Sequence, residues 1–178
     1  MKGIVFNVFE DFLDQTFGPG YWDEVLEKIN SPNDYYIASK IYPDQELLSV
    51  VSEVITQQNL PLNQALNLFG HFLFKTLTHS YSDIVSEFKT PKEFMESLDS
   101  IIHVEVKKIM PGSSPPQFLV VNSTDTETIL EYQSQRELCQ LANGLMQGLN
   151  DFFNYKIKID HYECKHRGDM RCRFKLEY

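Results

Sequence analysis

The chain has 178 residues, of which 42% are hydrophobic and 13% aromatic, a composition that suits one domain over residues 1–178 with an extensive core. Its formal net charge of −9 and the lack of any long Lys/Arg cluster argue against a nucleic-acid partner, because phosphate binding needs a concentrated basic face. No apolar run approaches the ~20 residues of a membrane span and no signal peptide opens the chain; with three cysteines that fit a reducing compartment, we expect a cytoplasmic protein without a membrane partner.

Helical periodicity dominates the first two-thirds of the chain. Apolar residues recur at three- and four-residue steps in four segments, residues 3–16, 21–29, 47–55 and 62–77. Asp44 precedes the third segment and is expected to be its N-cap. The fourth segment is apolar almost all round, so we expect that helix to be deeply buried. Pro91 opens a further helix, because proline in the first turn has no N–H to leave unpaired.

From Met110 onward the pattern changes to short strands around one helix. Strands are predicted at residues 118–121, 127–134, 155–160 and 171–178, with turns at 122–125 and 167–169. Between the second and third strands, five apolar residues mark one face of a long helix: Leu138, Leu141, Leu145, Leu149 and Phe152. We therefore expect an α+β domain, in which a helical N-terminal part packs on a C-terminal antiparallel sheet with one long helix.

Tyr132, Ser134 and Arg136 form the most specific chemical pattern in the chain. In an extended segment alternate side chains point the same way, so two hydroxyls and one guanidinium face one side, with no compensating acid on that face. These donors suit a doubly charged oxygen cluster, such as a pair of carboxylates or a phosphate. On spacing alone, an exposed strand end with ordinary polar residues explains the same pattern.

His103 lies in an apolar segment that fits two kinds of secondary structure. The β-branched residues around it favour a strand, whereas the longer apolar spacing over residues 94–109 favours a helix. A lone histidine beside apolar residues is more often a core residue than a metal ligand. His71 and His79 have no companion motif, and we interpret both as ordinary residues.

The position of His103 about thirty residues before Tyr-x-Ser-x-Arg, together with the opening residues Met1–Asn7, resembles the heme nitric oxide/oxygen binding (H-NOX) family. The resemblance covers essentially the whole chain. It is to bacterial stand-alone members of the family, which are related to the heme domain of soluble guanylate cyclase. It implies heme b between the helical part and the sheet, with His103 as a helical iron ligand. It also implies that Tyr132, Ser134 and Arg136 bind the heme propionates.

The resemblance also bears on which gases bind. Family members that hold dioxygen place a Tyr five residues after the motif's Arg, where this chain has Leu141. The supporting polar positions are Phe9 and Phe74 here, and Val5 and Leu145 complete an apolar pocket. Bound dioxygen carries superoxide-like charge and gains from a hydrogen-bond donor, which nitric oxide on ferrous iron does not need. We therefore expect the pocket to bind nitric oxide and carbon monoxide and to exclude dioxygen.

The resemblance also bears on a proline and two glycines of the pocket. Pro116 matches the family's proline that presses on the porphyrin and distorts it, with Pro115 as the adjacent alternative. Gly144 and Gly148 either bring a helix close to the porphyrin ring or are packing glycines.

All three cysteines, Cys139, Cys164 and Cys172, lie in the last 40 residues. With His161, three residues before Cys164, they make a set of tetrahedral zinc ligands, and some bacterial H-NOX proteins bind structural zinc with a similar pattern. On a regular strand His161 and Cys164 face opposite ways, so a zinc site requires a bulge or a strand end. His166 is a rival nitrogen ligand. Three inert buried cysteines, or redox-active thiols, are the alternatives to zinc.

The function that we expect is that of a stand-alone gas sensor and not of an enzyme. Nitric oxide weakens the iron–histidine bond and biases a two-state element that a separate partner reads. Bacterial family members of this kind pair with a sensor histidine kinase or a cyclic-di-GMP enzyme (a diguanylate cyclase or phosphodiesterase). One alternative is a peroxidase-like heme enzyme, which needs a distal His and Arg where this chain is apolar. A second alternative is a zinc-stapled interaction domain.

Overall fold

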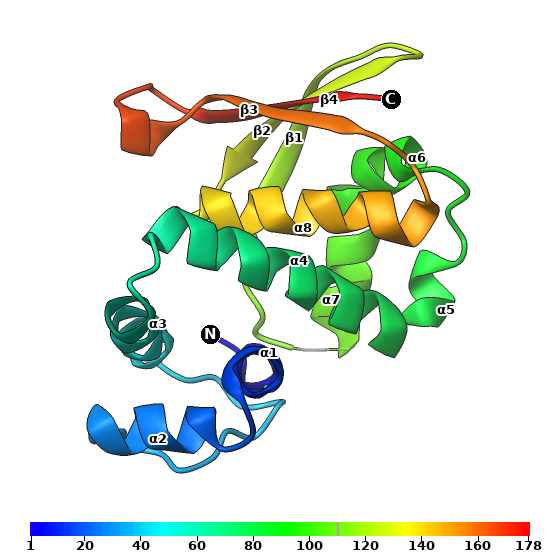
Figure 1. Ribbon diagram of the computed structural model, residues 1–178. Coiled ribbons are helices and arrows are strands. Elements are labelled where there is room, and N and C mark those ends of the chain that lie inside the picture. Colours follow the sequence, from blue (N-terminus) through cyan, green and yellow to red (C-terminus); the bar gives the residue numbers. More distant parts are fainter. Residues whose placement is uncertain (110) are drawn as a thin grey trace.

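Helices make up the N-terminal part of the structure, and a four-stranded sheet with one long helix makes up the C-terminal part (Figure 1). The computed structural model describes residues 1–109 and 111–178; Met110, where we expected helices to give way to strands, lies outside the described residues. The helices before this point are α1 (Gly3–Phe17), α2 (Tyr21–Lys28), α3 (Asp44–Gln58), α4 (Leu62–Ser80), α5 (Ser82–Val85), α6 (Pro91–Glu96) and α7 (His103–Ile109). A π-helical turn, Leu98–Ile102, leads directly into α7.

Two helix ends follow from the local chemistry of single residues. Gly18 ends α1 at a φ of 114°, a backbone conformation that side chains other than glycine rarely adopt. Thr90 caps α6, because its hydroxyl oxygen accepts the Glu93 N–H at 3.1 Å, and Pro91 is the first residue of that helix as expected.

Asp44 is not the N-cap that we expected. Pro43 occupies the cap position, and Asp44 is the first residue of α3. The Asp44 carboxylate binds the Met1 ammonium at 2.6 Å and the Arg136 guanidinium, also at 2.6 Å. A charged donor binds a carboxylate more strongly than a neutral backbone N–H does, which explains why this side chain turns away from the helix end.

The expectation that α4 is deeply buried is wrong for its first turns. Leu62 and Leu68 are 49% and 47% exposed, whereas Phe69, Leu73 and Phe74 are buried. The physical reason is that α4 packs on α8 (Cys139–Phe153) on one side and on α1 on another (Figure 1), and the rest of its surface, with Leu62 and Leu68, remains exposed.

The sheet has the order β1-β2-β4-β3, and all neighbouring strands are antiparallel. Its strands are β1 (Gln117–Ser123), β2 (Glu127–Gln133), β3 (Lys158–Glu163) and β4 (Cys172–Glu177). β1 extends to Ser123 where we expected a turn, because an irregularity after Val120 lets the pairing with β2 continue. β3 starts at Lys158 and not at Tyr155, since the backbone before it turns back to bond Asn150. The α+β arrangement is confirmed.

Three layers result from this packing. Figure 1 shows the sheet over α8, then α4 beside α8, then α1 to α3 on the far side of α4. One buried cluster joins α8, α6 and the sheet, and a second joins α1 to α4, with Leu145 in contact with both. The space between the two clusters is where the candidate site lies. Among the described residues, no helix combines the length and the apolar character needed to cross a membrane.

Glycines set the distance between α4 and α8. A Cβ on Gly70 would lie 2.2 Å from the Leu141 carbonyl oxygen, and one on Gly144 would lie 2.0 Å from the Asn67 carbonyl oxygen. A Cβ on Gly148 would meet the Phe74 side chain at 2.6 Å. Gly144 and Gly148 are therefore packing glycines between the two helices.

Candidate functional site

A cavity of about 350 Å³ lies between the two buried clusters, a volume within the range of cofactor sites. Residues from α1, α4, α7, α8, β1 and β2 line it, together with the segment that precedes β1. The sequence-predicted residues that it brings together are Val5, Phe74, His103, Pro115, Pro116, Tyr132, Ser134, Arg136, Leu141 and Leu145. The helical histidine, the Tyr-x-Ser-x-Arg motif and several apolar residues, which are distant from one another in the sequence, thus line the same cavity.

His103 is the first residue of α7, and its side chain is only 14% exposed. Its Nδ1 lies 2.7 Å from an oxygen of Asp99. Burial lowers the pKa of His103, although the Asp99 carboxylate opposes this shift. Since the carboxylate can only accept, Nδ1 carries the proton, and the neutral ring keeps the Nε2 lone pair for a metal.

Asp99 was missed by the sequence reasoning. Its second oxygen accepts the Phe118 N–H at 2.7 Å, so one carboxylate connects the imidazole to the start of β1. An acid four residues before a helical histidine is the sequence signal that could have found it.

Tyr132, Ser134 and Arg136 come from the end of β2 and the loop that follows, and all three line the cavity. Burial raises the pKa of Tyr132 to about 12, so its hydroxyl stays protonated and can donate. The Ser134 hydroxyl oxygen accepts the Arg136 N–H at 3.1 Å, which leaves its own proton available. The Arg136 guanidinium donates to Asp44 and, at 2.8 Å, to the Ser114 carbonyl. The expectation of no compensating acid is therefore wrong, because α3 supplies Asp44 from a distant part of the chain.

Phe9 does not line this cavity, contrary to our expectation. Its ring packs 4.6 Å from that of Phe69 and 6.2 Å from that of Trp22, inside the N-terminal cluster. Val5, one helical turn earlier on α1, takes the place at the cavity wall.

Several polar side chains of the lining were not anticipated, among them Ser113 and Tyr81. The Ser113 hydroxyl is buried and has no hydrogen-bond partner, and Tyr81 follows α4 at a helical spacing from Phe74 and Leu77. A buried hydroxyl without a partner is costly, so Ser113 calls for an acceptor or donor from a bound group. Both proline alternatives, Pro115 and Pro116, line the cavity, so the structure does not choose between them.

A family profile described as Haem-NO-binding matches residues 2–161. The chain belongs to the H-NOX family. Solved H-NOX structures from Shewanella oneidensis in the Fe(II)NO and Fe(II)CO ligation states are both 34% identical to it, with TM-scores of 0.93 and 0.89. Each match covers 99% of this chain and 98% of that chain. An unliganded Fe(II) H-NOX protein from K. algicida is 26% identical, with a TM-score of 0.88 over 99% of this chain and 96% of that one. A search of curated protein sequences found no match.

The H-NOX chain also holds a compact thiol and imidazole cluster. The ligand atoms of Cys139, His161, Cys164 and Cys172 all lie within 4.8 Å of one another. The three cysteines are buried, and the sulfurs of Cys139 and Cys164 are 3.7 Å apart. A register shift in β3 between Asp160 and Glu163 supplies the irregular strand that this set requires.

Burial shifts the pKa values in this cluster toward the uncharged forms of its side chains. Burial, and then the neighbouring thiols, raise the pKa of Cys139, and burial raises that of Cys172. Burial lowers the pKa of His161 to about 4, so its ring is neutral, and neither ring nitrogen has a hydrogen-bond partner. His166 lies outside the cluster, where its Nε2 is 2.7 Å from the Glu137 carbonyl oxygen. Of these two histidines, His161 is therefore the one that lies with the three cysteines.

Proposed function

We propose that this H-NOX chain is a heme-based gas sensor that binds nitric oxide and carbon monoxide at ferrous heme b in the 350 Å³ cavity. The observation that carries the proposal is a largely buried, neutral His103 whose Nδ1 is held by Asp99 and whose Nε2 is free to bind iron. Relatives in the Fe(II)NO and Fe(II)CO ligation states support the same assignment.

The residues around the cavity fit a heme at both its polar and its apolar parts. Tyr132, Ser134 and Arg136 would bind the propionates, because two hydroxyls and a guanidinium donate to carboxylates. The unpartnered hydroxyl of Ser113 also fits a group rich in acceptors. Heme supplies the iron position at which a diatomic gas coordinates.

The apolar part of the wall supports a preference among gases. Val5, Phe74, Leu141 and Leu145 line the cavity and carry no hydrogen-bond donor on their side chains. Such a wall suits nitric oxide and carbon monoxide and disfavours dioxygen, which needs a donor for the charge that it acquires.

Asp99 supports a route for the signal. A change in the position of His103 would act through this carboxylate on the backbone N–H of Phe118, at the start of β1. We propose that a separate partner reads this change, as a sensor histidine kinase or a diguanylate cyclase or phosphodiesterase would. The chain would thus sense and not catalyse.

The second metal in this proposal is structural zinc, bound by Cys139, His161, Cys164 and Cys172. Three thiols and one imidazole whose ligand atoms lie within 4.8 Å of one another support this proposal, because zinc takes such donors in a tetrahedral arrangement. The raised pKa values mean that burial disfavours the thiolate form of these cysteines. Zinc would offset this cost, because it binds the thiolate form. Inert or redox-active cysteines are the outcomes that metal analysis would reveal instead.

The absorption spectrum of the purified, reduced protein tests the main proposal. We expect a five-coordinate ferrous heme spectrum that changes on addition of nitric oxide or carbon monoxide. A purified protein that takes up no heme would contradict the proposal. Turnover of peroxide with a dye substrate, at the rate of a peroxidase, would favour the enzyme alternative.

A further inference from the structure

Thr78 brings a hydroxyl into the wall of the 350 Å³ cavity. It lies on α4, one helical turn after Phe74, and is only 5% exposed. Side chains four residues apart on a helix share one face, so Thr78 continues the wall to which Phe74 belongs. The apolar wall that we assign to the bound gas therefore has a buried polar neighbour.

The proton of this hydroxyl is already in use. The Thr78 Oγ1 lies 2.9 Å from the Phe74 carbonyl oxygen and 3.1 Å from that of Lys75, and it donates to these carbonyls. A hydroxyl has one proton and two lone pairs, whereas a carbonyl oxygen can only accept. In the part of the chain that the structure describes, no group donates to this Oγ1. The hydroxyl therefore has free lone pairs but no free proton.

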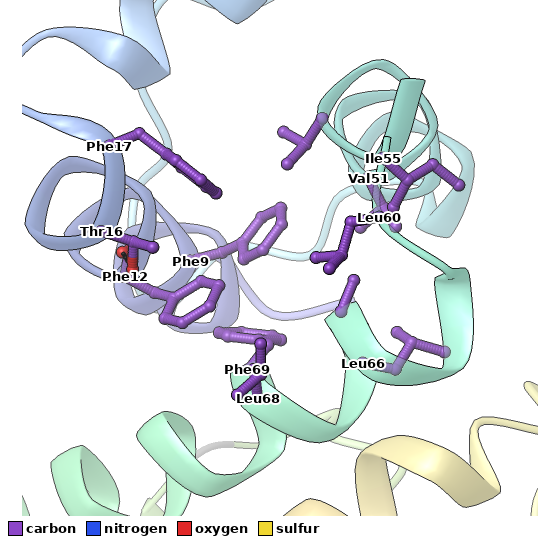
Figure 2. Close-up of a pocket in the computed structure, with 12 residues that line it drawn as sticks. Phe9, Phe12, Thr16, Phe17, Val51, Ile55, Leu60, Leu66, Leu68 and Phe69 are labelled. Carbon is purple, nitrogen blue, oxygen red and sulfur yellow. Dashed lines mark hydrogen bonds between the residues drawn. The ribbon is translucent and has the colours of Figure 1, made fainter. Parts of the chain in front are cut away.

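The same bond recurs at other threonines of these helices. Thr76 and Thr16 each donate to the carbonyl four residues earlier, at 3.2 and 2.6 Å, and Thr16 lies beside a small cavity between α1, α3 and α4 (Figure 2). A helical threonine has this carbonyl within reach of its hydroxyl. A buried donor without an acceptor is costly, so the Thr78 proton should stay with its own helix.

We propose that Thr78 helps to set the choice of gas, because it presents a lone pair, and not a proton, to a gas bound in the cavity. The proposal rests on the proposed function of this cavity as a heme site for gases. Dioxygen on ferrous iron acquires superoxide-like charge, which a lone pair repels. Nitric oxide and carbon monoxide acquire much less charge and are repelled less. Thr78 would thus act against dioxygen, in addition to the lack of a donor in the apolar wall.

Two pairs of side chains isolate the effect of the hydroxyl. Thr78→Val replaces it by a methyl group of similar size, and Thr78→Ala differs from Thr78→Ser by the hydroxyl alone. The Phe74 and Lys75 carbonyls lie inside α4, where helical N–H groups also bond them, so neither loses its only partner. Thr76→Val is the matched control, because Thr76 makes the same bond on the same helix and is outside the lining.

The infrared stretching frequency of bound carbon monoxide tests the lone pair directly. A lone pair beside the ligand opposes the transfer of electron density from iron to carbon monoxide and raises the frequency, whereas a hydrogen-bond donor lowers it. The frequency should therefore shift down in Thr78→Val, and it should be lower in Thr78→Ala than in Thr78→Ser. Thr76→Val should keep the wild-type frequency. An unchanged frequency in Thr78→Val would overturn the proposal, and a rise would show that the hydroxyl donates its proton instead.

Dioxygen gives the second measurement, by flash photolysis of the carbon monoxide complex in oxygen-saturated buffer. Thr78→Val should lower the dissociation constant of dioxygen about fivefold, which corresponds to one polar contact of about 1 kcal/mol. Thr76→Val should not change it. If Thr78→Val neither binds dioxygen more tightly nor forms a transient oxy complex that the wild type lacks, the proposal falls and the proposed function stands. A wild type that binds no carbon monoxide would overturn the proposed function, and this proposal with it.

Discussion

The Asp44 carboxylate receives two N–H groups of Arg136, at 2.6 and 3.4 Å, although the two residues are 92 positions apart in the sequence. Asp44 belongs to α3 in the N-terminal part, and Arg136 follows β2 in the C-terminal part. This ion pair therefore joins the two parts of the chain at the edge of the cavity that we assign to heme.

Asp44→Asn should lower the free energy of unfolding by about 1 kcal/mol at neutral pH, the upper range for a partly exposed ion pair. Burial would raise the pKa of Asp44, but hydrogen bonds from the Met1 ammonium and from Arg136 outweigh it and lower the pKa. A lowered pKa stabilises the fold at pH values above the ordinary pKa of the carboxyl group. This contribution is lost as the pH falls through the lowered pKa. The difference between wild type and variant in urea unfolding should therefore shrink below a pH of about 4.

Asp11→Asn is the control for this prediction. Asp11 is an exposed acid on α1 that lies outside the lining of the cavity. A loss of stability in Asp44→Asn that is equal to that in Asp11→Asn, or that persists unchanged in acid, would show that the ion pair does not stabilise the fold.

His103→Ala should lose the iron–histidine bond while the fold is retained, because the other residues of the cavity wall remain. Free imidazole should then restore a five-coordinate ferrous spectrum by taking the vacated position. His71→Ala is the matched control, since His71 is outside the lining and pairs with Asp151 at 2.9 Å. Unaltered heme ligation in His103→Ala without imidazole would refute the assignment of the ligand.

Cys164→Ser should lower both the zinc content and the melting temperature without changing the heme spectrum. Wild type should contain about one zinc per chain, because a set of four ligands binds one ion. His166→Ala should keep its zinc, since His166 lies outside the cluster. A folded wild type without zinc after preparation in reducing, zinc-containing buffer would rule the site out.

Gly144→Ala should destabilise the protein by about 1–3 kcal/mol, the range for overpacking a tight core. The added Cβ would lie 2.0 Å from the Asn67 carbonyl oxygen, a backbone atom that moves only if α4 moves. Gln147→Ala, at an exposed position on the same helix, should change stability by less than about 0.5 kcal/mol. Equal urea midpoints for the two variants would mean that α4 and α8 are not held together as closely as described.

Local signals predicted most of the secondary structure. Pro91 at the start of α6 and the apolar spacing of α8 each depend on neighbouring residues, and the structure has both. The shared cavity of His103 with Tyr132, Ser134 and Arg136 was expected from the resemblance to the H-NOX family.

Features that depend on tertiary contacts were not predictable in this way. Nothing near Asp44 in the sequence indicates that its carboxylate pairs with Arg136. The apolar spacing of α1 likewise does not tell which of its residues line the cavity. Phe9 was therefore wrongly assigned to the cavity wall, and the exposed first turns of α4 to the core. Asp99 was missed although it lies only four residues before His103, and its second contact, with the Phe118 N–H, is 19 positions away in the sequence.

Leu141 provides the sharpest test of gas choice. The ferrous wild type should bind nitric oxide and carbon monoxide in air-saturated buffer and form no stable dioxygen complex, because Val5, Phe74, Leu141 and Leu145 carry no donor. Leu141→Tyr should shift the protein toward dioxygen. A hydrogen bond to a charged acceptor contributes ~1.5–3 kcal/mol, or about one to two decades of affinity. The shift should be partial, since Phe74 gives the new hydroxyl no partner to orient it.

Leu141→Phe is the control that adds the ring without the hydroxyl, and it should not gain dioxygen binding. The absorption spectrum of each reduced protein after exposure to air is the measurement. A persistent oxy form in the wild type would contradict the prediction and would point to Tyr81, which also lines the cavity. Loss of that oxy form in Tyr81→Phe would then identify its hydroxyl as the donor, and the preference for nitric oxide would no longer follow from the apolar wall.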